Sequence, residues 1–516
     1  MKSAVNNLFS RFYSLRNLRL NRIMQKPEKV QAQLFERLIY AARNTEWGHI
    51  YDFKNIRSPK DFQTKVPLQE YETLYPYIKR MMHGEANVLW PGKISFYSKS
   101  SGTTNDKSKF IPVSPENLRK CHIRGTWDTM NLFYVEHPNS RIFAGKNFLM
   151  SGSVNEFEPH KSTIFGDVSA LMIKNMPYIA RPFFEPSIDI CLHPEWEEKI
   201  IKMAEVATRP DIASQVTMIG GVPTWILVFF RHILEKTGKD HMLEVWPAFE
   251  AYIHGGVSLL PYKEELKRYL PSDKISYRQV YNASEGYFGT QVHDKDEDML
   301  LLLDNGVYYE FLPKSEWNTN NPRTLQLHET EVGVTYALII STNSGLWRYQ
   351  IGDTIQFTEK HPYKFKIMGR TKQQLNVFGE EVMVDNTDTA IAKTCQDFLA
   401  EVREYTVGPV FMNKGKKGGH EWVMEFEHSP LNITAFEKAL DLNLQSVNTD
   451  YEAKRYRNMA LNNLKIRVVP NGTFDRWMKL RGKYGNQNKV PRLANHRTFI
   501  NEILKSANLQ PASSKG

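Results

Sequence analysis

A short loop rich in hydroxyl groups holds the residues with the clearest chemical potential. The loop and its edges contain the following residues: Ser100, Ser101, Gly102, Thr103, Thr104, Lys107 and Lys109. Successive Ser, Gly and Thr residues let a turn direct its backbone N–H groups inward, and such a concavity binds phosphate oxygens. The spacing differs from that of a Walker A motif, and a single glycine does not make a dinucleotide fingerprint. The loop alone leaves two alternatives open, a phosphate-binding loop and a polar hairpin turn.

Two carboxylates and an arginine follow predicted strands further along the chain. Ser284 and Glu285 come after a strand that ends near Tyr281, and a carboxylate in that position suits Mg²⁺ held between phosphates. We expect Asp353 to end another strand, where its carboxylate could accept hydrogen bonds from a ribose diol. Arg370 follows the next strand and could add a donor to the same sugar. Each of these clusters alone is weak evidence for a nucleotide site. Gly-Asp turns, for example, are common, and most of them are structural.

The elements around these clusters alternate between strands and helices. We expect a helix from Ser114 to about Val135 and a second, apolar helix over Pro223–Lys236. A buried strand over Ala248–Ile253 then leads to the turn Gly255–Val257, and a further strand over Ser276–Tyr281 follows. This alternation predicts an α/β fold with parallel sheets, whose ligand loops lie at the carboxyl ends of the strands.

From Tyr308 onward the sequence pattern changes from alternating strands and helices to a series of short strands. Short strands separated by turn residues predict a small β-barrel-like part or an antiparallel sheet. Beyond Gly369–Lys372 strands and helices alternate again, with a probable hairpin turning at Lys414–Gly419. We therefore predict a large N-terminal domain over residues 1–370 and a small α+β C-terminal domain over residues 371–516.

Composition and charge limit the possible partners. No apolar run approaches the length of a membrane span, and three dispersed cysteines predict a protein of the reducing cytoplasm. The net charge is +10, and residues 451–516 alone hold 14 Lys and Arg against 3 Asp and Glu. Either nucleic acid or a polyanionic small ligand would explain this basic segment. The basic N-terminus, Met1–Pro27, favours a helix packed against the body over a mitochondrial transit peptide.

The order of these motifs resembles that of a known superfamily. A Ser-Ser-Gly-Thr-Thr loop, a Gly-Gly turn, a Ser-Glu pair, Arg-x-x-x-Gly-Asp, Gly-Arg and a late lysine are similar to those of the adenylate-forming enzymes. These include acyl-CoA ligases, luciferases and peptide-synthetase adenylation domains. Ser100–Lys109, Ala283–Glu285 and Trp347–Asp353 resemble most closely the Gretchen Hagen auxin-responsive family of acyl acid–amido synthetases. The resemblance extends over almost the whole chain, to Asn486–Arg492.

The resemblance implies a two-step reaction with ATP and Mg²⁺. A carboxylic acid and ATP form an acyl-adenylate and pyrophosphate, and the amine of an amino acid then displaces AMP. Nucleotide binding is thereby assigned to Ser100, Ser101, Gly102, Thr103, Thr104, Lys109, Gly256, Val257, Ser284, Asp353 and Arg370. The catalytic roles fall to Glu285, as the Mg²⁺ ligand, and to Lys489, which would reach the α-phosphate. Lys372 occupies the position of the hinge about which the small domain rotates between the two steps.

The acyl-acid site and the acceptor are less defined by the sequence. Analogy with the family suggests His122, Arg124, Trp225 and Tyr252 as residues that contact the acid. Each of these four side chains is also compatible with a purely structural role. Coenzyme A or a carrier thiol is an alternative acceptor, and a non-enzymatic nucleotide- or nucleic-acid-binding protein is a more distant alternative. On the family reading we expect small carboxylic acid and amino acid substrates, no nucleic acid and no membrane partner, while the oligomeric state stays unknown.

Overall fold

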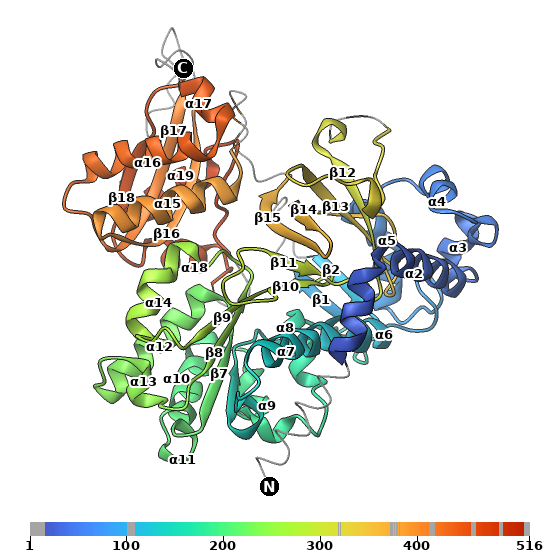
Figure 1. Ribbon diagram of the computed structural model, residues 1–516, viewed down its shortest axis with the longest axis horizontal. Helices are drawn as coiled ribbons and strands as arrows, with labels where there is room; N and C mark the ends of the chain where they lie inside the picture. The colour runs from blue at the N-terminus through green and yellow to red at the C-terminus, as the bar shows by residue number, and fades with distance from the viewer. Residues whose placement is uncertain are drawn as a thin grey trace. The chain divides into compact units, whose positions relative to one another are not determined.

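A computed structural model gives the fold of the chain (Figure 1). It describes residues 16–100, 109–317, 319, 321–371, 375, 377, 380, 382–411, 418–455, 461–484 and 489–509. The chain forms two compact units. The first comprises the chain up to Val257 together with Tyr269–Lys366, and the second comprises Ser258–Arg268 and the chain from Ile367 onward.

The first unit contains two sheets. The larger has eleven strands among the described residues, in the order β12-β13-β14-β15-β11-β10-β9-β8-β7-β3-β6. Its strands are β3 (Lys146–Leu149), β6 (Phe184–Glu185), β7 (Val216–Gly221), β8 (Ala251–Gly255), β9 (Ser276–Ala283), β10 (Gly286–Thr290), β11 (Met299–Leu301), β12 (Val307–Pro313), β13 (Thr335–Thr342), β14 (Tyr349–Lys360) and β15 (Tyr363–Arg370, of which the first unit holds the residues up to Lys366). The smaller sheet has the order β2-β1-β5-β4 and consists of β1 (Phe96–Ser100), β2 (Lys109–Val113), β4 (Val154–Glu156) and β5 (Ile164–Gly166).

The larger sheet is parallel at one end and antiparallel at the other. Strands β6, β3, β7, β8 and β9 pair in parallel, whereas β9–β10, β10–β11, β11–β15, β12–β13 and β13–β14 pair antiparallel. The predicted mixed α/β class is confirmed. Of the two arrangements predicted after Tyr308, the barrel-like part and the antiparallel sheet, the strands form an antiparallel sheet continuous with the parallel strands.

Helices cover the sheets of the first unit. They are α2 (Pro27–Ala42), α3 (Glu46–Ile50), α4 (Pro59–Lys65), α5 (Tyr71–Met82), α6 (Pro115–Asn117), α7 (Arg124–Glu136), α8 (Val168–Lys174), α9 (Ile188–Cys191), α10 (Trp196–Ala207), α11 (Pro210–Ala213), α12 (Pro223–Thr237) and α13 (Met242–Val245). A π-helical turn, Leu118–Ile123, joins α6 to α7, so the predicted helix from Ser114 to about Val135 is confirmed as one continuous helical segment.

Helix α12 illustrates how the sequence determines these elements. Pro223 begins the helix at a position that needs no backbone N–H donor, and Gly238 ends it with a φ of 65°. Ile226, Phe229 and Ile233 recur at helical spacing and are completely buried. The ring of Phe229 packs 6.3 Å from that of Phe148 on β3, which fixes the helix against the parallel strands.

The second unit is a three-stranded sheet with helices. Its elements are α14 (Lys263–Tyr269, up to Arg268), α15 (Val384–Phe398), β16 (Glu401–Val410), β17 (Gly419–His428), α16 (Ile433–Val447), α17 (Thr449–Arg455), β18 (Lys465–Val469), α18 (Thr473–Leu480) and α19 (Thr498–Ser506). Val410 pairs with Gly419, so the predicted hairpin exists, although its turn at 412–417 lies outside the described residues. Trp422, Tyr405 and Leu440 are buried in the core of this unit.

Basic residues of the C-terminal segment pair with carboxylates of their own unit. The pairs are Arg455–Asp441, Lys465–Glu437, Arg467–Glu421, Arg481–Glu502, Arg492–Glu404 and Arg497–Glu421. Much of the positive charge that raised nucleic acid as a partner therefore has a structural role within the fold.

The described part of the N-terminal segment is a helix over residues 16–25. The Arg16 guanidinium contacts both carboxylate oxygens of the buried Asp128 at 2.5 and 2.7 Å and also reaches Asp304. The packed-helix prediction holds for these residues. Among the described residues, no helix is both long enough and apolar enough to cross a membrane.

Candidate active site

The predicted phosphate loop joins two paired strands. Ser100 ends β1 and lies opposite Lys109, which begins β2. The Lys109 ammonium lies 5.5 Å from the centre of the Tyr71 ring, whose hydroxyl accepts a hydrogen bond of 2.8 Å from the Phe110 N–H. Ser101, Gly102, Thr103 and Thr104 lie outside the described residues, so their phosphate-binding role stays a prediction.

The strand that leaves this loop is anchored to the antiparallel strands. Ser344 lies in the turn between β13 and β14, and its hydroxyl donates to the Pro112 carbonyl and accepts from the Ser114 N–H, both at 2.7 Å. Asn117 donates to the side chain of Asn343 in the same turn at 2.9 Å. These contacts anchor the segment that follows the loop to the turn between β13 and β14.

Ser284 and Glu285 form the turn of the β9–β10 hairpin. Ala283 pairs directly with Gly286, so the two residues between them make the tightest connection that a hairpin allows. Their exposed fractions are only 8% and 7%. A nearly buried carboxylate at the end of a strand is a suitable hard ligand for Mg²⁺.

The π-helical turn packs on the same hairpin. The Tyr287 N–H donates to Cys121 Sγ at 3.2 Å, and His122 Nδ1 lies 3.0 Å from Asn282 Oδ1. The first of these contacts holds β10 and the second holds β9. Single π-helical turns are rare and occur often at functional sites, because the extra residue re-aims a side chain.

His122 is completely buried, and its Nε2 has no hydrogen-bond partner among the described residues. Burial lowers its pKa to about 4, so the imidazole is neutral at pH 7. An orphaned buried nitrogen is costly unless something supplies a partner. This nitrogen could accept a partner from a ligand, and the assignment of His122 to the acid stays a prediction.

The turn at the end of β8 contains two glycines at positions where a side chain would clash or strain the backbone. A Cβ on Gly255 would lie 2.6 Å from the Val280 carbonyl oxygen, and Gly256 has a φ of +87°. Only glycine adopts such a backbone without strain. The turn Gly255–Val257 thus brings bare backbone to the carboxyl edge of the parallel strands, and its predicted contact with adenine stays untested.

Asp353 does not end a strand, contrary to the sequence prediction. Gly352 and Asp353 lie inside β14, where the register with β13 shifts and Gly352 has a φ of +88°. A glycine at positive φ re-aims the strand without ending it, as in a β-bulge. The Tyr281 hydroxyl donates to Asp353 Oδ2 at 2.5 Å, which ties Asp353 to the strand that leads to Glu285.

The remaining nucleotide residues belong to the second unit. Arg370 is the last residue of β15, and Lys372, the predicted hinge, lies outside the described residues. Lys489 is exposed, but the following Val490 is buried and the Arg492 carbonyl accepts from the Val407 N–H at 2.8 Å. Arg492 also donates to the Tyr405 carbonyl at 3.0 Å and to the Tyr262 hydroxyl at 2.7 Å. Residues just past Lys489 are therefore fixed to their own unit.

The other acid-site candidates have structural partners. Arg124 donates to the Asp304 carbonyl at 3.0 Å and lies 3.4 Å from its carboxylate, beside Arg16. The Tyr252 hydroxyl donates to the Gly221 carbonyl at 3.1 Å, and burial raises its pKa well above the usual value. Trp225 packs edge-on against Trp196 with ring centres 4.4 Å apart. These contacts give each of the three side chains a structural role, and their assignment to the acid stays a prediction.

Sequence reasoning missed Tyr281 and Asn282 as positioning residues. Both lie in the segment that carries Ser284 and Glu285, but their roles depend on partners far away in the chain, Asp353 and His122. A signal was present, because alternate residues of a strand point to opposite faces. This alternation does not predict which distant residues the side chains on each face contact.

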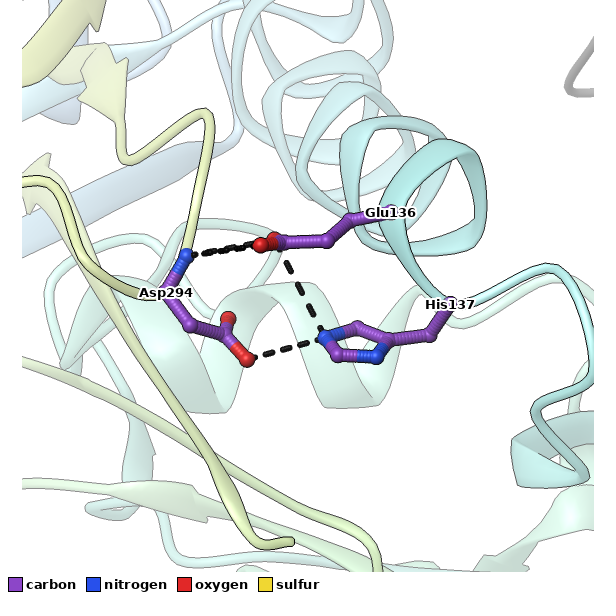
Figure 2. Close-up of side chains that lie close together, drawn as sticks. All are labelled: Glu136, His137 and Asp294. Atoms are coloured by element: carbon purple, nitrogen blue, oxygen red, sulfur yellow. Dashed lines mark hydrogen bonds and ion pairs between the residues drawn. The ribbon is translucent and has the colours of Figure 1, made fainter. Parts of the chain in front are cut away.

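A separate cluster of Glu136, His137 and Asp294 has the composition of a cation site. Figure 2 shows the three side chains converging from the end of α7 and from the segment after β10. His137 Nε2 lies 2.8 Å from Asp294 Oδ2, and the Asp294 N–H donates to Glu136. The completely buried Arg278 already donates to both carboxylates. We interpret the cluster as the counter-charge of Arg278, since the guanidinium occupies the place of a cation.

Comparisons with known proteins cover nearly the whole chain. The N-terminal, central and C-terminal domain models of the GH3 family match residues 16–275, 300–370 and 385–498. The indole-3-acetic acid-amido synthetase GH3.3 of Arabidopsis thaliana is 23% identical, over 92% of this chain and 91% of its own length. The jasmonoyl–L-amino acid synthetase JAR6 of Nicotiana attenuata is 22% identical, over 90% of each chain.

Solved structures share the fold. The GH3.15 acyl acid amido synthetase superposes with a TM-score of 0.77 at 17% identity, covering 98% of this chain and 97% of its own. A 2-hydroxyisobutyryl-CoA ligase in its postadenylation state gives a TM-score of 0.56 at 12% identity, over 96% and 92%. The matching domains extend over most of the sequence in the family's own order. The chain therefore belongs to the GH3 family, the Gretchen Hagen family that its motifs resemble.

Proposed function

We propose that this chain is an ATP-dependent ligase that joins a carboxylic acid to the amine of an amino acid, releasing AMP and pyrophosphate. Membership in the GH3 family carries this proposal, because the chain is similar over nine tenths of its length to proteins named as acid–amido synthetases. The geometry of the first unit supports it. Glu285, Asp353 and His122 come from three distant segments and are linked to one hairpin through Tyr281 and Asn282.

In the first step a carboxylate oxygen of the acid attacks the α-phosphorus of ATP, and pyrophosphate leaves. Two anions must approach each other, so the site has to supply positive charge and hydrogen-bond donors. We assign the loop Ser100–Thr104 and Lys109 to the phosphates, and Asp353 and Arg370 to the ribose. Lys489 supplies the charge that stabilises the α-phosphate as the bond forms.

Mg²⁺ fits the residues that would hold it. Glu285 presents a nearly buried carboxylate beside Ser284, and oxygen ligands of this kind suit a hard cation. When bound, Mg²⁺ neutralises charge on the phosphates. The role of the protein is to fix the Glu285 carboxylate, which the tight turn between β9 and β10 achieves.

In the second step the amine attacks the acyl carbon, and AMP leaves with the electron pair of the broken bond. The small C-terminal domain, predicted over residues 371–516 with a hinge at Lys372, would rotate between the two steps. The named acids of the relatives differ, indole-3-acetic acid in one and jasmonic acid in another. We therefore propose a small carboxylic acid and an amino acid as substrates without naming either. A cytoplasmic location remains a proposal that rests on the three dispersed cysteines.

Exchange of labelled pyrophosphate into ATP tests the first step. We expect exchange to depend on an added acid when a panel of aryl and alkyl acids, including indole-3-acetic acid, is tested. The most active acid is then incubated with ATP and either an amino acid mixture or coenzyme A. Mass spectrometry should detect an amide.

Two results would refute the proposal in different ways. A thioester in place of the amide would assign the chain to the alternative class of acyl-CoA ligases, whose fold it shares. Absence of exchange with every acid, together with salt-sensitive binding of RNA or DNA, would support the non-enzymatic alternative.

A further inference from the structure

A buried lysine on helix α10 has no role in the proposed reaction so far. Lys199 is on helix α10, and its side chain is completely buried. Its ammonium donates to the Ser151 carbonyl at 2.9 Å and to the Gly152 carbonyl at 2.8 Å. Burying a lysine is costly, so a specific geometric requirement is the usual reason for one.

The segment that Lys199 holds, Met150–Ser153, connects the two sheets of the first unit. It follows β3 of the larger sheet and leads into β4 of the smaller one. Strand β4 pairs with β5, and β5 pairs with β1, which runs into the predicted phosphate loop. The position of Met150–Ser153 therefore sets how the carboxyl edge of the parallel strands meets the phosphate side.

Asp167 contacts the same segment. A Cβ on Gly152 would lie 1.4 Å from Asp167 Oδ2, so the carboxylate packs directly against the bare backbone of this glycine. The Asp167 N–H also donates to the Ser153 carbonyl at 3.3 Å. The Lys199 ammonium and the Asp167 carboxylate also lie close enough for their opposite charges to attract.

Two residues assigned to the acid from the sequence are each linked to this segment or to Lys199 through one intermediate residue. The Tyr252 hydroxyl donates to the Gly221 carbonyl, and a Cβ on Gly221 would lie 3.1 Å from the Cβ of Met150. Trp225 packs on Trp196, which is on the same helix as Lys199 and lies 5.8 Å from its ammonium. These links come from two different elements, β8 and α12.

We infer that Met150–Ser153 forms a wall of the acid-binding site and that Lys199, together with Asp167, is the positioning residue that holds this wall. The inference rests on the proposed function and adds to it a residue and a segment that determine how the acid is held. Ligands of open α/β sheets bind beyond the carboxyl ends of the strands, which is where this segment lies. Lys199 acts through two backbone carbonyls and does not touch the reacting atoms.

Lys199→Met keeps the length of the side chain and removes the two hydrogen bonds. We expect the KM for the acid to rise at least about 10-fold, while the KM for ATP stays within about twofold. Gly152→Ala pushes Asp167 aside and should raise the KM for the acid in the same way. Lys146→Met is the matched control, because Lys146 donates to the Pro182 carbonyl at 3.1 Å from the opposite end of β3. It should leave both KM values unchanged.

Hydrogen exchange of the backbone amides separates this inference from the proposed function. Without any substrate, exchange in residues 150–153 should accelerate in Lys199→Met and remain at the wild-type rate in Lys146→Met. Unchanged exchange in Lys199→Met would show that the lysine does not hold the segment. Accelerated exchange with an unaltered KM for the acid would show that the segment is no wall of the site. If the wild type activates no acid, the proposed function fails, whereas the exchange result still decides the positioning role.

Discussion

At the scale of single residues, the candidate site consists of polar groups that the fold nearly excludes from water. Glu285, Ser284 and His122 are almost or completely buried, and the carboxylate of Asp353 is fixed by the Tyr281 hydroxyl. Low local dielectric strengthens each interaction that such groups make with a charged substrate. Replacing one of these residues should therefore have an effect on substrate binding or activity that is large enough to measure.

Glu285→Gln should preserve the fold and weaken adenylation that depends on Mg²⁺. The substitution keeps the size of the side chain and removes the charge from a ligand of a hard cation. We expect the Mg²⁺ concentration at half-maximal pyrophosphate exchange to rise at least about 10-fold, with an unchanged melting temperature. Wild-type exchange at limiting Mg²⁺ would exclude Glu285 from the metal role.

Asp353→Ala should raise the KM for ATP, because the ribose loses a hydrogen-bond acceptor. Inorganic triphosphate lacks a ribose, so its binding should be unchanged, and isothermal calorimetry with both ligands measures the contrast. Tyr281→Phe serves as the companion variant and should give a smaller increase, since it removes one hydrogen bond to the carboxylate and keeps the carboxylate itself. An unaltered KM for ATP in Asp353→Ala would make Gly352-Asp353 a structural feature of β14 alone.

The buried histidines predict that stability declines in mild acid. Burial lowers the pKa of His122 to about 4 and that of His254 to about 3. The unfolded chain binds these protons near pH 6.5 and the folded chain does not, so stability is lost as the pH falls from about 6.5 toward 4. For His122 this difference corresponds to roughly 3 kcal/mol at pH 4.

Urea unfolding of His122→Asn between pH 7 and pH 4 measures this effect. The variant should lose less stability over that range than the wild type, by an amount that approaches the figure for one buried histidine. His49→Asn is the control, because His49 is exposed on α3. Parallel pH profiles for His122→Asn and the wild type would contradict the account.

At the scale of elements, helices were easier to predict than the pairing of strands. The helix after Ser114 and helix α12 have caps and apolar periods that local sequence determines. Strand pairing is non-local, so the sequence did not predict that the antiparallel strands after Tyr308 continue the parallel sheet. Asp353 was wrongly placed at a strand end, because Gly-Asp usually signals a turn and here occupies a shift in register within β14.

Lys199 shows why part of the site was missed. It lies one turn from Trp196 and beside Ile200, on the buried face of α10. Most lysines in such helices extend to solvent, so a buried one is not expected from the pattern. The loop that it holds is 48 residues away in sequence, and no local signal connects the two.

The cluster in Figure 2 should behave as an ion-pair network and not as a metal site. Asp294→Asn should reduce the free energy of unfolding by about 3 kcal/mol, because it leaves the buried Arg278 with less counter-charge. Addition of Zn²⁺ or EDTA should leave the melting temperature unchanged. Glu297→Gln removes an exposed ion pair with Lys366 and should change stability by less than about 0.5 kcal/mol. Stabilisation by Zn²⁺ in the wild type would contradict this interpretation.

At the scale of the whole molecule, the proposed residues are divided between two compact units. Glu285, Asp353 and His122 belong to the first, whereas Arg370 and Lys489 belong to the second. Lys489 is exposed, yet Arg492 anchors the residues just after it through Glu404, Tyr405 and Val407. The residues just after Lys489 are therefore fixed within the second unit, and the alternation of this unit between two half-reactions stays a proposal.

Comparison of the two half-reactions in Lys489→Ala tests the central claim most directly. Adenylate formation is followed by pyrophosphate exchange, and amide formation is followed by supplying synthetic acyl-adenylate with the amino acid. We expect the variant to keep the wild-type melting temperature, since Lys489 is exposed. Adenylate formation should fall at least about 10²-fold, the scale of one lost transition-state contact, while amide formation from the supplied adenylate stays within a few-fold. Equal losses in both half-reactions, or no loss in either, would contradict the account.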